Sequence, residues 1–187
     1  MSSQKIPVKE ARVYIENVSR RIALLHLAYA RTIVDELGEE EGLELIAKAI
    51  RLYGKLIGEE VRKRVVNKGL EPTVENWSHG EDIPSFGMHE KIEYTTVGNE
   101  LRVRAYGCVL AKVWREYGEE RLGRMYCYVD PVKYITYDPN YKLVHLKTMP
   151  DGYEYCEFVV SQSSYEDKKI LDVDKNVYNL LVEVDKP

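Results

Sequence analysis

Residues 143–160, LVHLKTMPDGYEYCEFVV, place two strand-forming runs on either side of a turn signal. The first run is Leu143–Thr148 and the second is Tyr155–Val160. Between them, Met149–Gly152 contains a Pro and an Asp-Gly pair, which are typical of tight connections. The segment therefore predicts a β-hairpin in the C-terminal half of the chain.

Two long amphipathic helices are predicted before this hairpin. Apolar residues step by three or four along each of them, which is the spacing of one helix face. The first stripe is Ile15, Val18, Ile22, Leu25, Tyr29, Ile33 and Leu37, and the second is Leu43, Ile46, Ile50, Tyr53, Ile57, Val61 and Val65. Gly38 separates the two helices, so they are expected to pack as an antiparallel helical hairpin.

The region between the helical hairpin and residue 143 mixes loop, strand and helix signals. Residues 70–90 are broken by Pro and Gly and predict a loop that covers a site. Residues 92–106 alternate around a Gly-Asn turn and predict another β-hairpin. Helical periodicity returns after Gly107, stops at Gly118 and resumes, and Pro131 either starts a new turn or kinks this second run.

This order of elements predicts an α+β fold. Its N-terminal antiparallel helical hairpin packs with an antiparallel sheet and two further helices. The length of 187 residues fits a single domain, 1–187, in which residues 161–187 form a C-terminal extension. Within that extension, Val177–Val184 reads equally well as a short helix or an edge strand.

Composition restricts the class of partner. The chain has 27 basic and 31 acidic residues, and its net charge of -4 predicts no attraction to nucleic acid or to anionic membranes. No apolar run approaches a membrane span, and the run Ile22–Ala30 is too deep in a helical pattern to be a secretory signal. A cytoplasmic location is therefore expected. The abundance of Glu, Lys, Arg and Tyr is a composition reported for proteins of hot-growing organisms.

The three cysteines mark the C-terminal half as the place of chemistry. An odd, sparse set in a chain of this length predicts a site rather than a disulfide framework. Cys127 and Asp130 are three residues apart in a helical run and are expected to share a face, although a carboxylate alone raises a thiol pKa. Cys108 opens a helix, where the dipole favours thiolate, and Cys156 follows a turn into a strand. Burial in the core is the competing explanation for each thiol.

A metal site is a second hypothesis for the same region. Imidazole and thiolate both bind zinc or iron, so Cys108, His145 and Cys156 would form a three-ligand set if the fold brought them together. Their spacing is not that of a zinc finger. His79 and His89, in the loop, are further candidate ligands, although a single loop histidine is usually solvated.

Five short motifs in order resemble the L-2-amino-thiazoline-4-carboxylic acid hydrolase family. They are Gly107-Cys108, Trp114-Arg115-Glu116-Tyr117-Gly118, Cys127-Tyr128-Val129-Asp130, Leu146-Lys147-Thr148 and Asp151-Gly152-Tyr153-Glu154-Tyr155-Cys156-Glu157-Phe158. With the N-terminal portion, the likeness covers most of residues 20–160. The later motifs are also similar to the 4-vinyl reductase domain and to phenol-sensing domains, a group whose members enclose a small molecule, often dimerise and in some cases bind zinc.

The resemblance implies hydrolytic opening of a cyclic amidine-like thiazoline to a carbamoylated cysteine. For this reaction we expect Cys127 or Cys108 as nucleophile or metal ligand and Asp130 as proton-transfer group. Arg104 or Lys147, chosen for charge and closeness to the strands, is expected to bind the substrate carboxylate, with Trp114 at the substrate. In the sensor-type pattern the zinc ligands fall on Cys108, His145, Thr148 and Cys156, and Thr148 is not a thiol here. The expected assembly is a homodimer around a small-molecule ligand. The alternatives are a non-catalytic small-molecule-binding module and a structural subunit that docks through the tail from Ser161.

Overall fold

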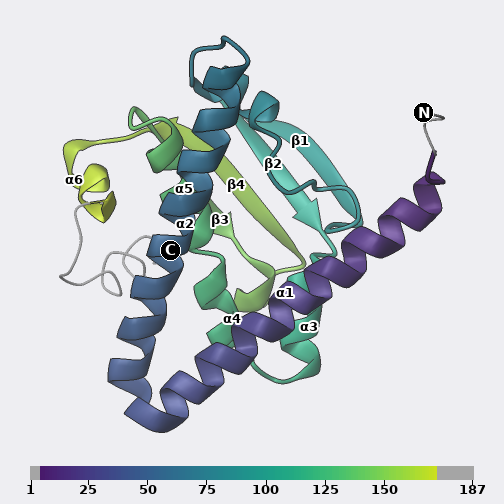
Figure 1. Cartoon of the computed structure of the whole chain (residues 1–187), viewed down its shortest axis with the longest axis vertical. Helices are drawn as coiled ribbons and strands as arrows, with labels where there is room; N and C mark the ends of the chain where they lie inside the picture. Colours follow the sequence, from purple (N-terminus) through teal and green to yellow (C-terminus); the bar gives the residue numbers. More distant parts are fainter. Residues whose placement is uncertain (1–4, 172–187) are drawn as a thin grey trace.

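Three layers make up residues 5–171, the part of the chain that the computed structural model describes (Figure 1). The principal helices are α1 (Val8–Leu37), α2 (Glu39–Asn67), α3 (Val109–Glu116), α4 (Glu120–Tyr126), α5 (Val129–Tyr137) and α6 (Tyr165–Lys168). The strands are β1 (Lys91–Val97), β2 (Glu100–Tyr106), β3 (Tyr141–Lys147) and β4 (Tyr155–Gln162). Short 3-10 helices occupy η1 (Val74–Gly80), η2 (Met149–Asp151) and η3 (Lys169–Leu171).

The sheet is antiparallel throughout and has the order β1-β2-β4-β3. Both predicted hairpins are confirmed, as β1–β2 and β3–β4. The two hairpins are joined where β2 pairs with β4, in a register that sets Ala105 opposite Cys156 and Val103 opposite Phe158. Directly opposed residues share a face of the sheet, so these four side chains lie together.

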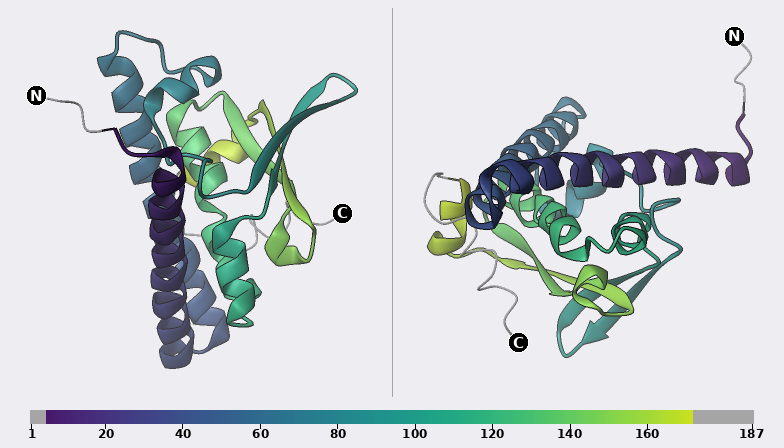
Figure 2. Two further views of the ribbon diagram at one scale, coloured as in Figure 1. Left: turned by 90° about the vertical axis from the view of Figure 1, so that its right-hand side faces the viewer. Right: turned by 90° about the horizontal axis from the view of Figure 1, so that it is seen from below.

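Helices cover one face of this sheet in two successive layers. Seen from below, α3, α4 and α5 lie next to the sheet and the long helices α1 and α2 lie outside them (Figure 2). Trp114 of α3 is buried, and its ring packs directly against Gly123 of α4. A Cβ at position 123 would lie 2.2 Å from the ring, so no larger residue fits there without a shift of the ring. The predicted α+β fold with its N-terminal helical hairpin is therefore confirmed.

The hairpin bends at Gly38, whose φ of 81° is readily adopted only by glycine. From this elbow α1 and α2 diverge into a V (Figure 1). The predicted stripe of α2 is largely confirmed, since Leu43, Ile46, Ile50, Val61 and Val65 are all buried.

Only part of the predicted stripe of α1 meets the body of the protein. Ile22 and Ile33 pack against the core, whereas Val18, Leu25, Tyr29 and Leu37 are exposed. The buried residues of α1 are instead Ser19, Ala23, His26, Leu27 and Ala30. Small side chains on this face let α3 and α4 approach closely, and the indole N–H of Trp114 donates to the Ala23 carbonyl at 3.4 Å. The imidazole of His26 makes a 2.7 Å hydrogen bond to the Leu122 carbonyl. The buried face of α1 is therefore made of small residues, Leu27 and His26.

Two other predictions need adjustment. The second helical run divides at Cys127 into α4 and α5, and Pro131 lies in the first turn of α5, where its missing N–H removes no helix bond. The predicted loop at 70–90 contains η1. Val177–Val184, for which the sequence left helix and strand open, lies outside the described residues. No helix among residues 5–171 is long and apolar enough to cross a membrane.

Candidate functional site

A cavity of about 890 Å³ lies between the helix-covered face of the sheet and the helices α2 and α5. Side chains of β2 and β4, including Val103, Ala105 and Phe158, form its floor. The segment that contains Asp82 and His89 supplies part of its wall, as expected for a segment that covers a site. Its size falls in the range of small-molecule pockets.

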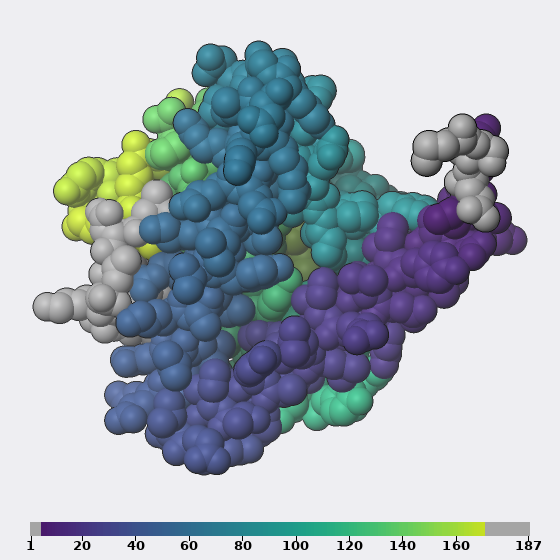
Figure 3. Space-filling model, in the orientation of Figure 1, coloured from purple at the N-terminus to yellow at the C-terminus, as the bar shows by residue number. Residues whose placement is uncertain are grey.

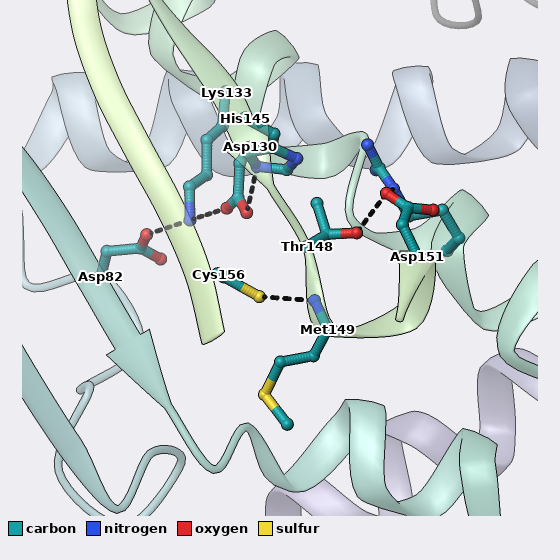
Figure 4. A network of polar contacts seen from close by, with 9 residues as sticks. Asp82, Asp130, Lys133, His145, Thr148, Met149, Asp151 and Cys156 are labelled. Atoms are coloured by element: carbon teal, nitrogen blue, oxygen red, sulfur yellow. Dashed lines mark hydrogen bonds and ion pairs between the residues drawn. The ribbon is translucent and has the colours of Figure 1, made fainter. Parts of the chain in front are cut away.

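A chain of charged groups runs across this cavity (Figure 4). The ammonium of Lys133, on α5, lies between two carboxylates, 2.7 Å from Asp82 Oδ2 and 2.9 Å from Asp130 Oδ1. The other carboxylate oxygen of Asp130 lies 3.4 Å from His145 Nε2 on β3. Lys133 follows Asp130 by three residues in α5, which puts both on one helix face.

The charges of this cluster hold each other ionised. Burial disfavours the carboxylate of Asp130, but Lys133 and His145 together outweigh burial and hold the pKa of Asp130 below its usual range. Burial likewise opposes the charge of Lys133, and Asp130 and Asp82 overcome it and raise the pKa of that amine. The cavity therefore presents a permanent anion, Asp130, beside a permanent cation, Lys133, near neutral pH.

Two histidines border the same cluster. The ring nitrogens of His145 are buried, and neither makes a hydrogen bond of good geometry within the described residues. His89 lines the cavity, and its buried Nδ1 is also without a hydrogen-bond partner there. Burial lowers the pKa of His89, against the pull of Asp130, so this imidazole is neutral near pH 7. A bound molecule with polar atoms would find unused donors and acceptors at both rings.

All three cysteines line the cavity as free thiols. Burial raises the pKa of Cys127 well above its usual range and that of Cys156 to about 12. Cys108 caps the N-terminus of α3, and the N–H groups of Ala111 and Leu110 lower its pKa, yet burial dominates and the net shift is upward. The thiolate expected at this helix end is therefore not favoured, and all three groups are neutral thiols near pH 7.

The predicted metal set does not fit this arrangement. Among residues 5–171, no group of three or more His, Cys, Asp or Glu side chains is placed to hold a metal ion. His145 turns toward Asp130, and Cys156 Sγ accepts the backbone N–H of Met149 at 3.3 Å. Thr148, a ligand position in the sensor-type pattern, donates its hydroxyl hydrogen to Asp151 instead (Figure 4). The arrangement of the described residues therefore gives no support to zinc or iron on Cys108, His145 and Cys156.

The pattern that defines the L-2-amino-thiazoline-4-carboxylic acid hydrolase family matches residues 17–160, which is most of the chain. The chain belongs to this family. No curated protein and no solved structure matches it in the corresponding comparisons. The matched residues of this thiazoline hydrolase family member include the whole charged cluster, both cavity histidines and the three thiols.

Some of the residues expected at the site of this family member lie elsewhere. Arg104 points to the opposite face of the sheet, because side chains alternate along β2 and its neighbours Val103 and Ala105 face the cavity. Its guanidinium binds Glu157 at 2.8 Å on that outer face. Lys147 donates to the Tyr155 hydroxyl at 3.1 Å and does not line the cavity either. Neither cation is placed to bind a carboxylate inside the cavity.

Other expected residues do meet there. Cys108, Cys127, Cys156, Asp130, His145 and Trp114 all line the cavity, although Trp114 is also a core residue that is 1% exposed. Sequence reasoning missed Lys133, which its i+3 spacing from Asp130 could have indicated. It missed Asp82 because nothing local relates that loop residue to α5. His89 was expected to be solvated, which is true of the exposed His79 and wrong for His89.

Proposed function

We propose that this chain hydrolyses a small cyclic amidine-like substrate of the 2-amino-thiazoline-4-carboxylate type in the cavity beside Asp130. The observation that carries the proposal is the Lys133–Asp130 pair, an ionised anion and cation 2.9 Å apart on the wall of a largely apolar cavity. A 2-amino-thiazoline-4-carboxylate has the matching charges, a basic N–C–N group and a carboxylate on one small ring. The family name supports the same substrate class.

The reaction requires addition of water and scission of one ring bond. The water oxygen bonds to the ring carbon that lies between nitrogen and sulfur, and that carbon's bond to sulfur breaks. The two protons of the water end on the sulfur, which leaves as a thiol, and on the former ring nitrogen. The carbon becomes a urea carbonyl on the cysteine nitrogen. The product is a carbamoylated cysteine, and no oxidant or reductant is consumed.

Asp130 binds the N–C–N group in this proposal. Its pKa lies below the usual range, so it is a weak base and a stable anion near neutral pH. A carboxylate beside a protonated amidine keeps that group cationic, which makes its central carbon a better electrophile. Hydrogen bonds of this charged kind are stronger than neutral ones and more so in a site that excludes water.

Lys133 binds the substrate carboxylate. An ammonium has three N–H donors, and Asp82 and Asp130 take two of them. The third is left for a ligand. Arg64 also lines the cavity, but its side chain is 45% exposed and is bound to Glu60 and to the Gly80 and Glu81 carbonyls.

His89 is the base that takes a proton from the attacking water. Its pKa is lowered by burial, so the imidazole is neutral and has a nitrogen lone pair available. The three thiols are protonated near pH 7 and are poor nucleophiles in that state. Water is therefore the nucleophile here, and the cysteines shape the cavity wall.

The test is incubation of the purified chain with L-2-amino-thiazoline-4-carboxylate, with release of thiol followed by a chromogenic disulfide and the gain of one water by mass spectrometry. The His89→Gln variant is expected to lose turnover, with its melting temperature little changed. The matched control is His79→Gln, because His79 is exposed on the same segment and does not line the cavity. Absence of both turnover and binding in the wild type would remove the proposal.

A non-catalytic binding module for a bulkier ligand is the second candidate, and the volume of the cavity favours the bulkier ligand. One five-membered ring with a carboxylate fills only part of about 890 Å³. Saturable binding of the thiazoline acid by calorimetry with no thiol release over days would identify this case. A bulkier cyclic C–N or C–S compound would then bind more tightly than the thiazoline acid.

A further inference from the structure

The floor of the cavity consists of three rows of side chains that cross the sheet. Members of one row lie opposite or nearly opposite one another on neighbouring strands, and successive rows are two residues apart along each strand. From the inside outward, the rows are Ala105 and Cys156, then Val103, Phe158 and His145, then Leu101, Val160 and Leu143. The third row is wholly aliphatic and lies about 7 Å beyond the row that contains His145.

Aromatic rings face this aliphatic row from the helices. Tyr134 follows Asp130 by four residues in α5, so it lies about 6 Å beyond Asp130 on the same side of the helix. Because α5 passes into β3 through a short turn, this end of α5 lies at the end of the sheet that holds Leu143. The Trp77 ring stacks on the Tyr134 ring with centroids 4.1 Å apart, and both rings line the cavity. An apolar compartment therefore adjoins the charged pair of Asp130 and Lys133.

The cavity is open to solvent and larger than the thiazoline acid needs. Leu101 and Ile83 line it and are nevertheless 60% and 41% exposed. Figure 3 shows the molecule hollowed between α1 and α2, with the yellow-green of the sheet visible at the bottom of the hollow. One five-membered ring held at Asp130 and Lys133 leaves most of about 890 Å³ unfilled. Exposed apolar side chains beside a pocket are typical of a ligand-binding groove.

We propose that this outer compartment, formed by Leu101, Leu143, Val160, Trp77 and Tyr134, binds an aromatic substituent of the substrate. The inference rests on the proposed function and narrows its substrate class to a 2-amino-thiazoline-4-carboxylate whose nitrogen outside the ring carries an arylalkyl group. The N–C–N group at Asp130 places that nitrogen one helical turn from Tyr134. Water still adds to the carbon between nitrogen and sulfur, the same carbon–sulfur bond breaks, and the substituent stays on the urea nitrogen of the product.

The compartment should act through burial of apolar surface. A benzyl group is close in size to a Phe side chain, and its transfer from water into the compartment should strengthen binding about tenfold to a hundredfold. The Trp77 and Tyr134 rings add the preference of aromatic groups for one another.

The test compares the unsubstituted thiazoline acid with its 2-benzylamino derivative. Calorimetry gives Kd and thiol release gives kcat/KM for each compound, and the wild type should prefer the benzyl compound at least about tenfold. Leu101→Asn should lower this preference at least about threefold, and Val160→Thr, which places a hydroxyl in the floor, should lower it as well. The matched control is Leu52→Asn, because Leu52 is 59% exposed on α2 and does not line the cavity.

The two readouts separate this inference from the proposed function. Hydrolysis of the unsubstituted acid with no preference for the benzyl compound would refute the compartment and leave the proposed function in place. A preference in binding that falls in Leu101→Asn but not in Leu52→Asn, with no thiol release from either compound, would support the compartment and refute hydrolysis. An equal loss of preference in Leu101→Asn and Leu52→Asn would overturn the compartment, and failure of both compounds to bind would overturn both proposals.

Discussion

Replacement of Asp130 by Asn separates the contribution of the charged cluster to catalysis from its contribution to stability. Asp130→Asn keeps the shape of the side chain and removes its charge from Lys133, 2.9 Å away, and from His145, 3.4 Å away. Loss of one partner of a buried ion pair costs about 3–5 kcal/mol when the other is left unpaired. Lys133 keeps Asp82 at 2.7 Å, and the Asp130 side chain is 29% exposed, so the free energy of unfolding should fall by only about 1–3 kcal/mol.

Activity should fall by much more than stability. If Asp130 holds the amidinium through the transition state, its removal should lower kcat/KM by about 10²–10³, the cost of losing one such electrostatic contact. Asp82→Asn is the matched control, because it removes the other carboxylate on Lys133 and leaves Asp130 in place. Both variants should lose similar stability in urea titrations, and only Asp130→Asn should lose most of its thiol release.

The pH dependence gives an independent check on the same residue. The pKa of Asp130 is lowered by folding, so its contribution to stability is complete above the unfolded pKa of about 4 and is lost as pH falls toward the folded value. The stability of Asp130→Asn should therefore approach that of the wild type in acid. Equal activity of the Asp130 and Asp82 variants, or a stability difference that persists unchanged down to pH 2, would refute this account of the cluster.

Three further outcomes are expected. Cys127→Ser should keep activity within about tenfold of the wild type, since the raised pKa of this thiol leaves little thiolate. A folded but inactive Cys127→Ser variant would show that Cys127 is the nucleophile. Arg104→Ala should leave KM for the thiazoline acid unchanged. It should lower the free energy of unfolding by about 1–3 kcal/mol, because the Glu157 side chain is only 3% exposed and loses its partner at 2.8 Å. A raised KM would instead place Arg104 at the substrate. Burial lowers the pKa of His26, so the unfolded chain takes up a proton that the folded chain does not, and the free energy of unfolding in urea should decline from pH 7 to pH 5. His26→Leu should show a shallower decline. An identical slope in the two proteins would contradict a lowered pKa at His26.

Local patterns in the sequence were enough to predict most of the elements. The turn at Met149–Gly152 and the alternation on either side of it predicted the β3–β4 hairpin, and the spacing of apolar residues predicted α1 and α2. These features depend on neighbours within a few residues, which is the range over which hydrophobic periodicity and turn chemistry act. The ordered motifs also carried the family resemblance, which the match over residues 17–160 confirms.

Long-range packing decided the rest. Arg104 and Val103 are adjacent in sequence and point to opposite faces of the sheet, so charge alone could not tell which of them meets the cavity. The dipole at the start of α3 favoured thiolate at Cys108, and burial by distant elements reversed that preference. Asp82 joins Lys133 across fifty-one residues, a pairing that no local spacing encodes.

The sequence by itself determined the α+β class and the family. It also indicated the three thiols and Asp130 as candidate site residues. Only the tertiary structure decided that Lys133, Asp82 and His89 share this cavity, that Arg104 and Lys147 do not, and that α1 turns a polar and small-residue face inward. The reason is physical. Helix and strand periodicities are properties of the chain over one or two turns, whereas ionisation state and the direction of a side chain depend on which elements, far apart in sequence, pack around it.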